Sequence, residues 1–397
     1  MWLVSRLSSV SALTRLDCRP DPLFSPMPFS ADSNPVKVTD SGCLTPFGDA
    51  AATCAALLRG EKALKPVPVA GVDGGDLVPV ALLPGRAMDE TNPPAWGAAV
   101  KKLFSPVAGP RWGTARRPIF VTSSNFGVGS LHAFRKTGDI GHLAFSSPHG
   151  CVDWLRREQG WGDNFAIFSH ACVSAHLGLV HAARMVSSGL ADEALVATFD
   201  FISPFVAGGF HALKILNTDF PAPYMDRATG SIGLGDGAAY AVLSREGAGF
   251  KILAQNLHNE MFHFTANQPD GAGFQACLAP VLEKAKGLRL WIKGHGTGTL
   301  EAGRLESTRL AAAFPDSPLV GWKGSLGHTL GSCGLVELAI AIEAIRAGRS
   351  PGTVGTVAPA FMKNVATEPF SNREFNAVLC ASNAFGGAHA ALLLAHD

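Results

Sequence analysis

Three residues that lie far apart in the sequence carry side chains suited to acyl transfer. Cys172 follows an apolar run that predicts a strand, and a stretch with helical periodicity, 177–186, comes after it. A cysteine at such a corner faces the positive end of the helix dipole, which favours the reactive thiolate. His295 and His328 each follow an apolar run inside a glycine-rich segment. One thiol and two imidazoles on tight corners predict an acyl-transfer site.

The elements that must position these corners alternate along the chain. Strands are expected at 36–48 (with a turn), 117–123, 193–199, 238–243, 250–254, 288–292 and 318–321, and helices at 49–60, 177–186, 273–285 and 332–346. The segment 67–94 is expected to be rich in loops. Such alternation predicts α/β layers with largely parallel sheets. The units around Cys172 and His328 have the same order of strand, small-residue corner and helix, so we expect a duplicated architecture with the site where the halves meet.

Composition excludes several classes of protein. The chain has 397 residues, of which 47% are hydrophobic and 16% charged, and this suits an enzyme with much buried sheet. With a net charge of +1, the chain lacks the excess of basic residues that is typical of nucleic-acid-binding domains. No apolar run reaches the ~18 residues of a membrane helix. Eight scattered cysteines without a CxxC pair predict neither a zinc site nor a disulfide framework, and they fit a reducing cytoplasm. No metal site is expected.

Residues 1–35 differ from the rest of the chain and are expected to form an N-terminal extension. Arginines among serines and apolar residues, with no acid before Asp17, resemble a weak organelle transit peptide. The alternatives are a start site placed too far upstream, with Met27 as the true initiator, or a disordered arm rich in Pro, Ser and Asp.

Four short motifs follow one another along the chain. They are HACVSA at 170–175, HGTGT at 295–299, KGSLGH at 323–328 followed by 331–334, and FGG at 385–387. With these motifs the chain, from about Val36 to its end, resembles the β-ketoacyl synthases of the thiolase superfamily, the condensing enzymes of fatty acid and polyketide synthesis. The resemblance implies a thiolase-like duplicated five-layered α-β-α-β-α fold. Its halves would span 36–245, with the nucleophile, and 246–397, with the two histidines.

The resemblance also implies roles for the motif residues. Cys172 would attack an acyl thioester, and the backbone N–H groups of Cys172 and Phe385 would hold the oxyanion. His295 and His328 would hydrogen-bond the thioester carbonyl of a malonyl unit and favour its decarboxylation by stabilising the enolate. Phe385 would also serve as a gate between the acyl pocket and the malonyl side.

Further residues are implied around this triad. Lys323 would lie behind His328, Glu306 would pair with that lysine, and Glu337 would be a further carboxylate behind the site. Thr297 and Thr299 would hydrogen-bond the phosphopantetheine arm of the substrate.

The chain departs from the family pattern near the site. Ala175, Leu300 and Gly303 replace a glycine, a proline and an aspartate. Asn383 stands where the family has a first phenylalanine in its C-terminal loop, and Phe126 falls on the floor of the acyl pocket, where relatives have a smaller residue. We expect both to contact substrate. These changes indicate a specialised synthase, such as a ketosynthase of secondary metabolism.

The resemblance implies no tightly bound cofactor, since the acyl groups arrive on the phosphopantetheine of an acyl carrier protein. It implies a homodimer, or a heterodimer with a related ketosynthase or chain-length-factor chain. The alternative hypothesis is that this chain is itself a chain-length-factor-like partner subunit, although such subunits usually lose the cysteine. A non-decarboxylating thiolase would need a second cysteine as its acid, and the pair His295 and His328 argues against it.

Overall fold

The computed structural model describes residues 35–69, 75–91 and 93–395. The prediction of an N-terminal extension over 1–35 lies outside this part of the chain, except for Pro35. None of the helices within the described ranges is long and apolar enough to cross a membrane.

Five strands from the first part of the chain form one half of a ten-stranded sheet. Their order is β1-β8-β6-β4-β5. The strands are β1 (Lys37–Leu44), β4 (Ile119–Thr122), β5 (Phe165–Phe168), β6 (Glu193–Asp200) and β8 (Gly237–Ser244). Strand β4 is parallel to β5 and β6, whereas β8 is antiparallel to β6 and β1.

Five later strands repeat this pairing in the order β9-β15-β14-β10-β11. The strands are β9 (Phe250–Asn259), β10 (Leu290–Lys293), β11 (Leu319–Val320), β14 (Ala377–Ala384) and β15 (Ala388–Ala395). Strand β10 is parallel to β11 and β14, and β15 is antiparallel to β14 and β9. Among the described strands, the two sets join where the start of β1 pairs with the start of β9. The duplicated architecture is therefore confirmed.

The expectation of largely parallel sheets is wrong, because each set of five strands is mixed. In the second set, β14 turns directly into β15 through the tight loop 385–387, and a hairpin of this kind joins antiparallel strands.

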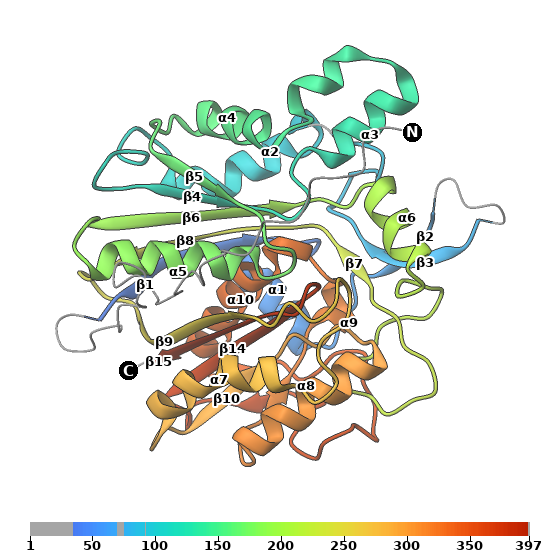
Figure 1. The fold of residues 1–397 in the computed structure, drawn as a ribbon, viewed down its shortest axis with the longest axis vertical. Coiled ribbons are helices and arrows are strands. Elements are labelled where there is room, and N and C mark those ends of the chain that lie inside the picture. The colour runs from blue at the N-terminus through green and yellow to red at the C-terminus, as the bar shows by residue number, and fades with distance from the viewer. Residues whose placement is uncertain (1–34, 70–74, 92, 396–397) are drawn as a thin grey trace, which may run out of the picture. The chain divides into compact units, whose positions relative to one another are not determined.

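Helices cover both faces of each set of strands (Figure 1). In the middle layer, α5 (Ser174–Ser187) and α10 (Cys333–Ala347) lie between the two sets of strands, with α1 (Ala50–Leu58) against α10. On the outer faces, α2 (Pro93–Phe104) and α4 (Pro148–Gln159) lie beside the first set, and α7 (Ala272–Ala285) and α8 (Leu300–Ala313) beside the second. This is the expected α-β-α-β-α order of layers.

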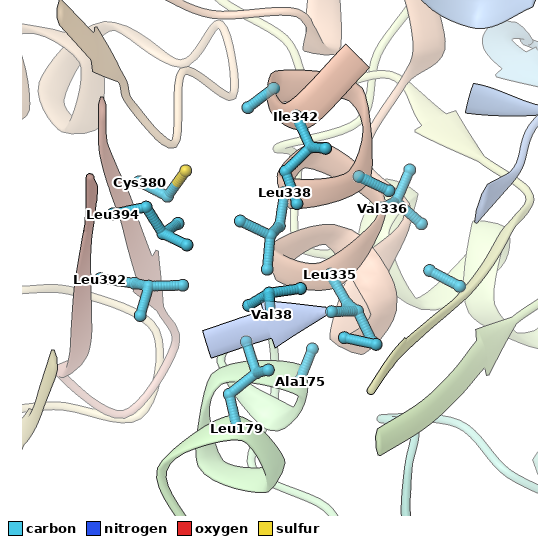
Figure 2. Close-up of a cluster of buried hydrophobic side chains, with 14 of the residues drawn as sticks. Val38, Ala175, Leu179, Leu335, Val336, Leu338, Ile342, Cys380, Leu392 and Leu394 are labelled. Carbon is cyan, nitrogen blue, oxygen red and sulfur yellow. The ribbon is translucent and has the colours of Figure 1, made fainter. Parts of the chain in front are cut away.

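The middle layer is the most deeply buried part of the fold. Helix α10 is apolar around most of its circumference, as a helix enclosed on all sides must be. Figure 2 shows its Leu335 and Leu338 with Leu179 of α5 and Leu392 of β15. Each such side chain contributes about 1.5–3 kcal/mol when fully buried. The corners that begin α5 and α10 are therefore fixed on a rigid support.

Shorter elements complete the described chain. They are β2 (Lys65–Pro68), β3 (Leu77–Ala81), β7 (Leu234–Gly235), β12 (Arg349–Ser350), β13 (Phe370–Ser371), α3 (Val128–Thr137), α6 (Pro204–Ala212), α9 (Lys323–Leu326), and the 3₁₀ turns η2 (Ser105–Val107), η3 (Ile140–Phe145) and η4 (Leu330–Ser332). The segment 67–94, expected to be rich in loops, is mostly loop where it is described, and it holds the end of β2, all of β3 and the start of α2. Helices α2, α3, α4, α6, α8 and α9 were not predicted.

Candidate active site

Cys172 lies on the corner between β5 and α5, and the backbone there is strained. Ala171 has φ +44°, which is unusual for a residue with a Cβ. The hydroxyl of Ser174 holds this turn, since it accepts from the N–H of His170 and donates to the carbonyl of Ala171, both at 2.7 Å. The Cys172 side chain is thereby presented at the start of α5, with the residue only 9% exposed.

His328 lies on the second corner, between α9 and η4. Gly327 has φ +72°, and a Cβ there would lie 2.4 Å from the Leu234 backbone, so the turn requires glycine. The N–H of Leu330 donates to His328 Nδ1 at 3.1 Å, which leaves the ring proton of neutral His328 on Nε2. Nε2 is 3.1 Å from Cys172 Sγ. His328 therefore presents a hydrogen-bond donor to the site.

His295 follows β10 and faces His328 nearly edge-on, with ring centroids 5.0 Å apart and planes at 84°. Its backbone is held on both sides: its N–H donates to Glu306 at 2.6 Å, and its carbonyl accepts from Lys323 Nζ at 2.7 Å. Its Nδ1 is buried without a hydrogen-bond partner among the described residues.

The structure thus brings the three predicted residues together, since Cys172 Sγ and a nitrogen of each histidine ring lie within 4.8 Å of one another. Burial, with the positive charge of Lys323, lowers the pKa of both His295 and His328 well below the usual value, so both rings are neutral at neutral pH. The donor types would suit a tetrahedral metal ion. Two buried ammonium groups behind the histidines, Lys293 and Lys323, oppose another cation there.

Burial opposes the expected effect of the helix dipole, which favours a Cys172 thiolate. Burial raises the pKa of the Cys172 thiol, and neighbouring Cys333 adds to this rise. Lys323 and the backbone N–H of Phe385 act in the opposite direction, but the loss of hydration on burial outweighs both. The resting sulfur is therefore a neutral thiol.

The predicted pairing of Glu306 with Lys323 is wrong. Lys323 Nζ lies 2.6 Å from Glu337 Oε1, and Glu337 Oε2 contacts Lys293. Although burial alone would raise the pKa of Glu337, the two ammonium groups together hold it below its usual value. Glu306 instead binds backbone, because its carboxylate accepts from the N–H groups of His295 and Gly296.

Tyr224, which the sequence did not single out, completes the surroundings of Glu306. Its hydroxyl donates to Glu306 Oε2 at 2.9 Å. A Cβ on Gly294 would lie 2.2 Å from the same hydroxyl oxygen, which explains a glycine directly before His295. Glu306 is therefore a brace for the backbone that carries His295.

Phe385 lies in the loop between β14 and β15, where Gly386 and Gly387 both have positive φ. Its backbone N–H lies close enough to the Cys172 sulfur to favour the thiolate electrostatically. Its ring lies 5.9 Å from that of Phe210, a second aromatic residue that sequence analysis missed. Thr297 and Thr299 are half-buried after His295, with their hydroxyl oxygens 3.1 Å apart.

Asn383, which was expected to contact substrate, does not face Cys172. Its Oδ1 lies 2.7 Å from His389 Nδ1, and His389 packs against Phe274 of α7. The neighbouring residue Ala384 packs in the Cys172 cluster. Because successive side chains of a strand point to opposite faces, Asn383 lies on the far side of β14.

Phe126 has φ +31°, and its ring packs edge-on against Phe199 at 6.0 Å. It lines a narrow pocket that Trp96 and Phe201 also enclose. Asp200 forms part of the same wall and was not predicted. Its carboxylate accepts hydrogen bonds from Ser123 Oγ and the backbone N–H groups of Ser124, Asn125 and Ser332.

Comparisons with known proteins agree with this geometry. Residues 251–356 match the family model for the C-terminal domain of β-ketoacyl synthases. The chain is 27% identical over 334 residues to 3-oxoacyl-[acyl-carrier-protein] synthase 2 of Coxiella burnetii, covering 78% of this chain and 77% of that protein. It is 30% identical over 258 residues to the protein of the same name from Rhizobium meliloti, covering 59% and 61%.

Solved structures show the same fold. A β-ketoacyl synthase from Burkholderia phymatum superposes with a TM-score of 0.74 at 20% identity, over 92% of this chain and 100% of that chain. A ketosynthase in complex with its chain length factor, from Xenorhabdus doucetiae, gives a TM-score of 0.73 at 21% identity, over 92% and 98%.

Proposed function

The chain belongs to the β-ketoacyl synthase family, and we propose that it catalyses the decarboxylative Claisen condensation of an acyl group with a malonyl group. Both groups would be carried as thioesters on the phosphopantetheine of an acyl carrier protein. The observation that carries the proposal is the meeting of the Cys172 thiol with two neutral imidazoles from separate corners.

In the first step, the Cys172 sulfur attacks the carbonyl carbon of the acyl thioester. A new C–S bond forms, the bond to the phosphopantetheine sulfur breaks, and the proton lost by Cys172 ends on the released thiol. The backbone N–H of Phe385, which already lies near the sulfur, is suited to hold the oxyanion.

In the second step, the malonyl thioester loses CO₂, and the electrons of the broken C–C bond pass into an enolate. His328, with its proton on Nε2, and His295 donate hydrogen bonds to the enolate oxygen. The enolate carbon then attacks the acyl-Cys172 thioester, and the C–S bond breaks to regenerate Cys172 and release a 3-oxoacyl product. Each neutral ring keeps one N–H, which can donate to the oxygen on which negative charge develops.

The surrounding residues have positioning roles in this proposal. Lys323 and Glu306 hold the backbone of His295 by its carbonyl and its N–H respectively. Glu337 holds Lys323. Thr297 and Thr299 would bind the phosphopantetheine arm, because their hydroxyls are half-buried directly after His295.

The same proposal includes a carrier protein and a second subunit, either a copy of this chain or a related one. The solved relatives include a ketosynthase bound to an acyl-carrier protein and ketosynthases paired with chain length factors. We further propose halves at 36–245 and 246–397, which the repeated strand order supports. A cytoplasmic location is supported by seven free, buried cysteines in the described chain.

The second candidate, a chain-length-factor-like subunit, takes its support from the partners of those relatives. A thiol-directed acyl mimic separates the two. Intact-mass analysis should show one adduct on the folded protein and none on Cys172→Ser, with Cys333→Ser as the matched control that keeps the adduct. A protein that is unlabelled at Cys172 while folded would favour the partner subunit.

A further inference from the structure

Lys293 is a fully buried lysine at the end of β10, two residues before His295. The three residues before it are apolar, and the whole strand is buried. Its ammonium group contacts Glu337 Oε2, while the other oxygen of that carboxylate binds Lys323. One carboxylate therefore serves two ammonium groups.

The second nearby carboxylate, Glu306, forms no ion pair with the two lysines. It is occupied by two backbone N–H groups and the Tyr224 hydroxyl. Lys293 and Lys323 therefore share Glu337 as their ion-pair partner, and the charge of Glu306 acts on them only through space. Burying two ammonium groups beside one ion-pairing carboxylate is unfavourable in the resting protein unless something offsets it.

We propose that Lys293 is a positioning residue for the condensation, which supplies a second buried positive charge behind His295 and His328. This inference rests on the proposed function. The charge keeps both rings neutral, each with one N–H to donate, and it stabilises the enolate when negative charge appears between them. The cost of burying the ammonium group is then offset in the transition state.

The charges facing the two histidines agree with this role. Burial is the main reason for the lowered pKa of each ring, and the positive charges of Lys323 and Lys293 both add to it. His176 on α5, buried beside the same cluster, has its pKa lowered to about 3 by burial and by the same lysines, so it adds no charge. The titratable and charged groups that face this cluster are Cys172, His176, Asp200, Tyr224, Lys293, Glu306, Lys323, Cys333, Glu337 and Cys380.

The test compares malonyl decarboxylation by the wild-type protein with Lys293→Met and Lys293→Gln. Methionine removes the charge and the donor, whereas glutamine keeps an N–H donor for Glu337 but no charge. We expect kcat to fall about tenfold in both variants, with KM within twofold of wild type. The acid limb of the plot of kcat against pH should move up by about one pH unit, because the histidines protonate more easily once the charge is gone. This is the size expected for removing a charge within ~10 Å at an effective dielectric constant near 20. Lys286→Met, at an exposed lysine on the surface, is the control and should change nothing.

The outcomes are distinguishable. If wild type decarboxylates malonyl groups and folded Lys293→Met keeps kcat within twofold, the inference is overturned. If Lys293→Gln restores wild-type kcat and pH profile while Lys293→Met does not, Lys293 acts only as a hydrogen-bond donor, and the electrostatic role is wrong. If wild type has no such activity, the proposed function fails instead.

A measurement on the unaltered protein covers the case in which neither variant folds. Nitrogen-15 NMR of lysine Nζ separates ammonium groups from neutral amines. We expect every lysine to be an ammonium group at pH 7. A neutral buried lysine at that pH would remove the second charge and overturn the inference.

Discussion

Asp200, at the end of β6, accepts a 3.0 Å hydrogen bond from the backbone N–H of Ser332, the residue directly before α10. The same carboxylate binds the Ser123 hydroxyl at 2.7 Å. It thus ties the wall of the pocket around Phe126 to the segment that follows His328, and it couples the two halves of the fold at the site.

Asp200→Asn should change how stability depends on pH. Although four hydrogen-bond donors favour its ionised form, burial outweighs them and raises the pKa of Asp200 to about 7, from an ordinary value of 3.8. At a pH between 3.8 and about 7, Asp200 has lost its proton in the unfolded chain but keeps it in the folded chain. The free energy of unfolding therefore falls with rising pH by about 1.4 kcal/mol per unit from this group.

The asparagine variant lacks this proton, so its stability relative to wild type should improve from pH 5 to pH 7. Urea unfolding at both values measures the difference. Ser123→Ala is the control, since it removes one donor and keeps the titrating carboxyl group. An equal difference between Asp200→Asn and wild type at both pH values would contradict the prediction.

Glu306→Gln should destabilise the protein and lower activity, because an amide offers one acceptor oxygen where the carboxylate offers two. An N–H of His295 or Gly296 would then be buried unpaired, at a cost of about 1–3 kcal/mol. Tyr224→Phe removes only one donor and should cost about 0.5–1.5 kcal/mol with activity retained. Thermal unfolding and malonyl decarboxylation together check this, and equal effects of the two substitutions would argue against Glu306 as the brace of the His295 backbone.

His295→Ala and His328→Ala should each reduce malonyl decarboxylation by about 10²–10³, the usual effect of losing one oxyanion donor. Acylation of Cys172, followed by intact mass, should fall less, since the histidines act chiefly on the enolate. His263→Ala, on the surface, serves as the control. Acylation that falls as far as decarboxylation would mean that the histidines mainly activate the thiol.

Phe126→Ala should widen the acyl pocket. Extra methylenes forced against a packed ring cost about 1–3 kcal/mol, or one to two decades in acylation rate. We therefore expect wild type to prefer short or flat acyl groups, and the variant to accept longer saturated chains while decarboxylation stays nearly unchanged. Acylation rates over a series of chain lengths measure this. An unaltered chain-length profile would place the floor of the pocket elsewhere. Asn383 would not form that floor, because its side chain faces away from Cys172.

The sequence predicted the corners of the site well, because each is a local pattern of apolar strand, small residues and helix. Helix α10, expected at 332–346, spans Cys333–Ala347. Strand direction could not be predicted in the same way, because the antiparallel return of β8 and β15 depends on which strands they lie beside. Helix α2 escaped prediction because Gly97 and its prolines interrupt the pattern, although Gly97 is required by close contact with Trp154.

The electrostatic partners were harder to predict than the catalytic residues. Lys323 was assigned to Glu306, yet its partner Glu337 lies on the same face of α10 as Cys333, four residues earlier. Cys333 Sγ is 3.3 Å from the Cys172 carbonyl oxygen, so that face of the helix lies at the site. A signal for Lys293 was also present, since a lysine that ends a buried apolar strand needs a partner.

We propose that Cys172, His295 and His328 together perform decarboxylative condensation. The most direct test incubates the protein with acyl and malonyl carrier proteins and follows both CO₂ and the carrier-bound product by mass. We expect CO₂ and a 3-oxoacyl product in equal amounts, with Cys172→Ser forming no 3-oxoacyl product. A folded protein with a free Cys172 thiol that forms no 3-oxoacyl product from any starter acyl group would contradict the account.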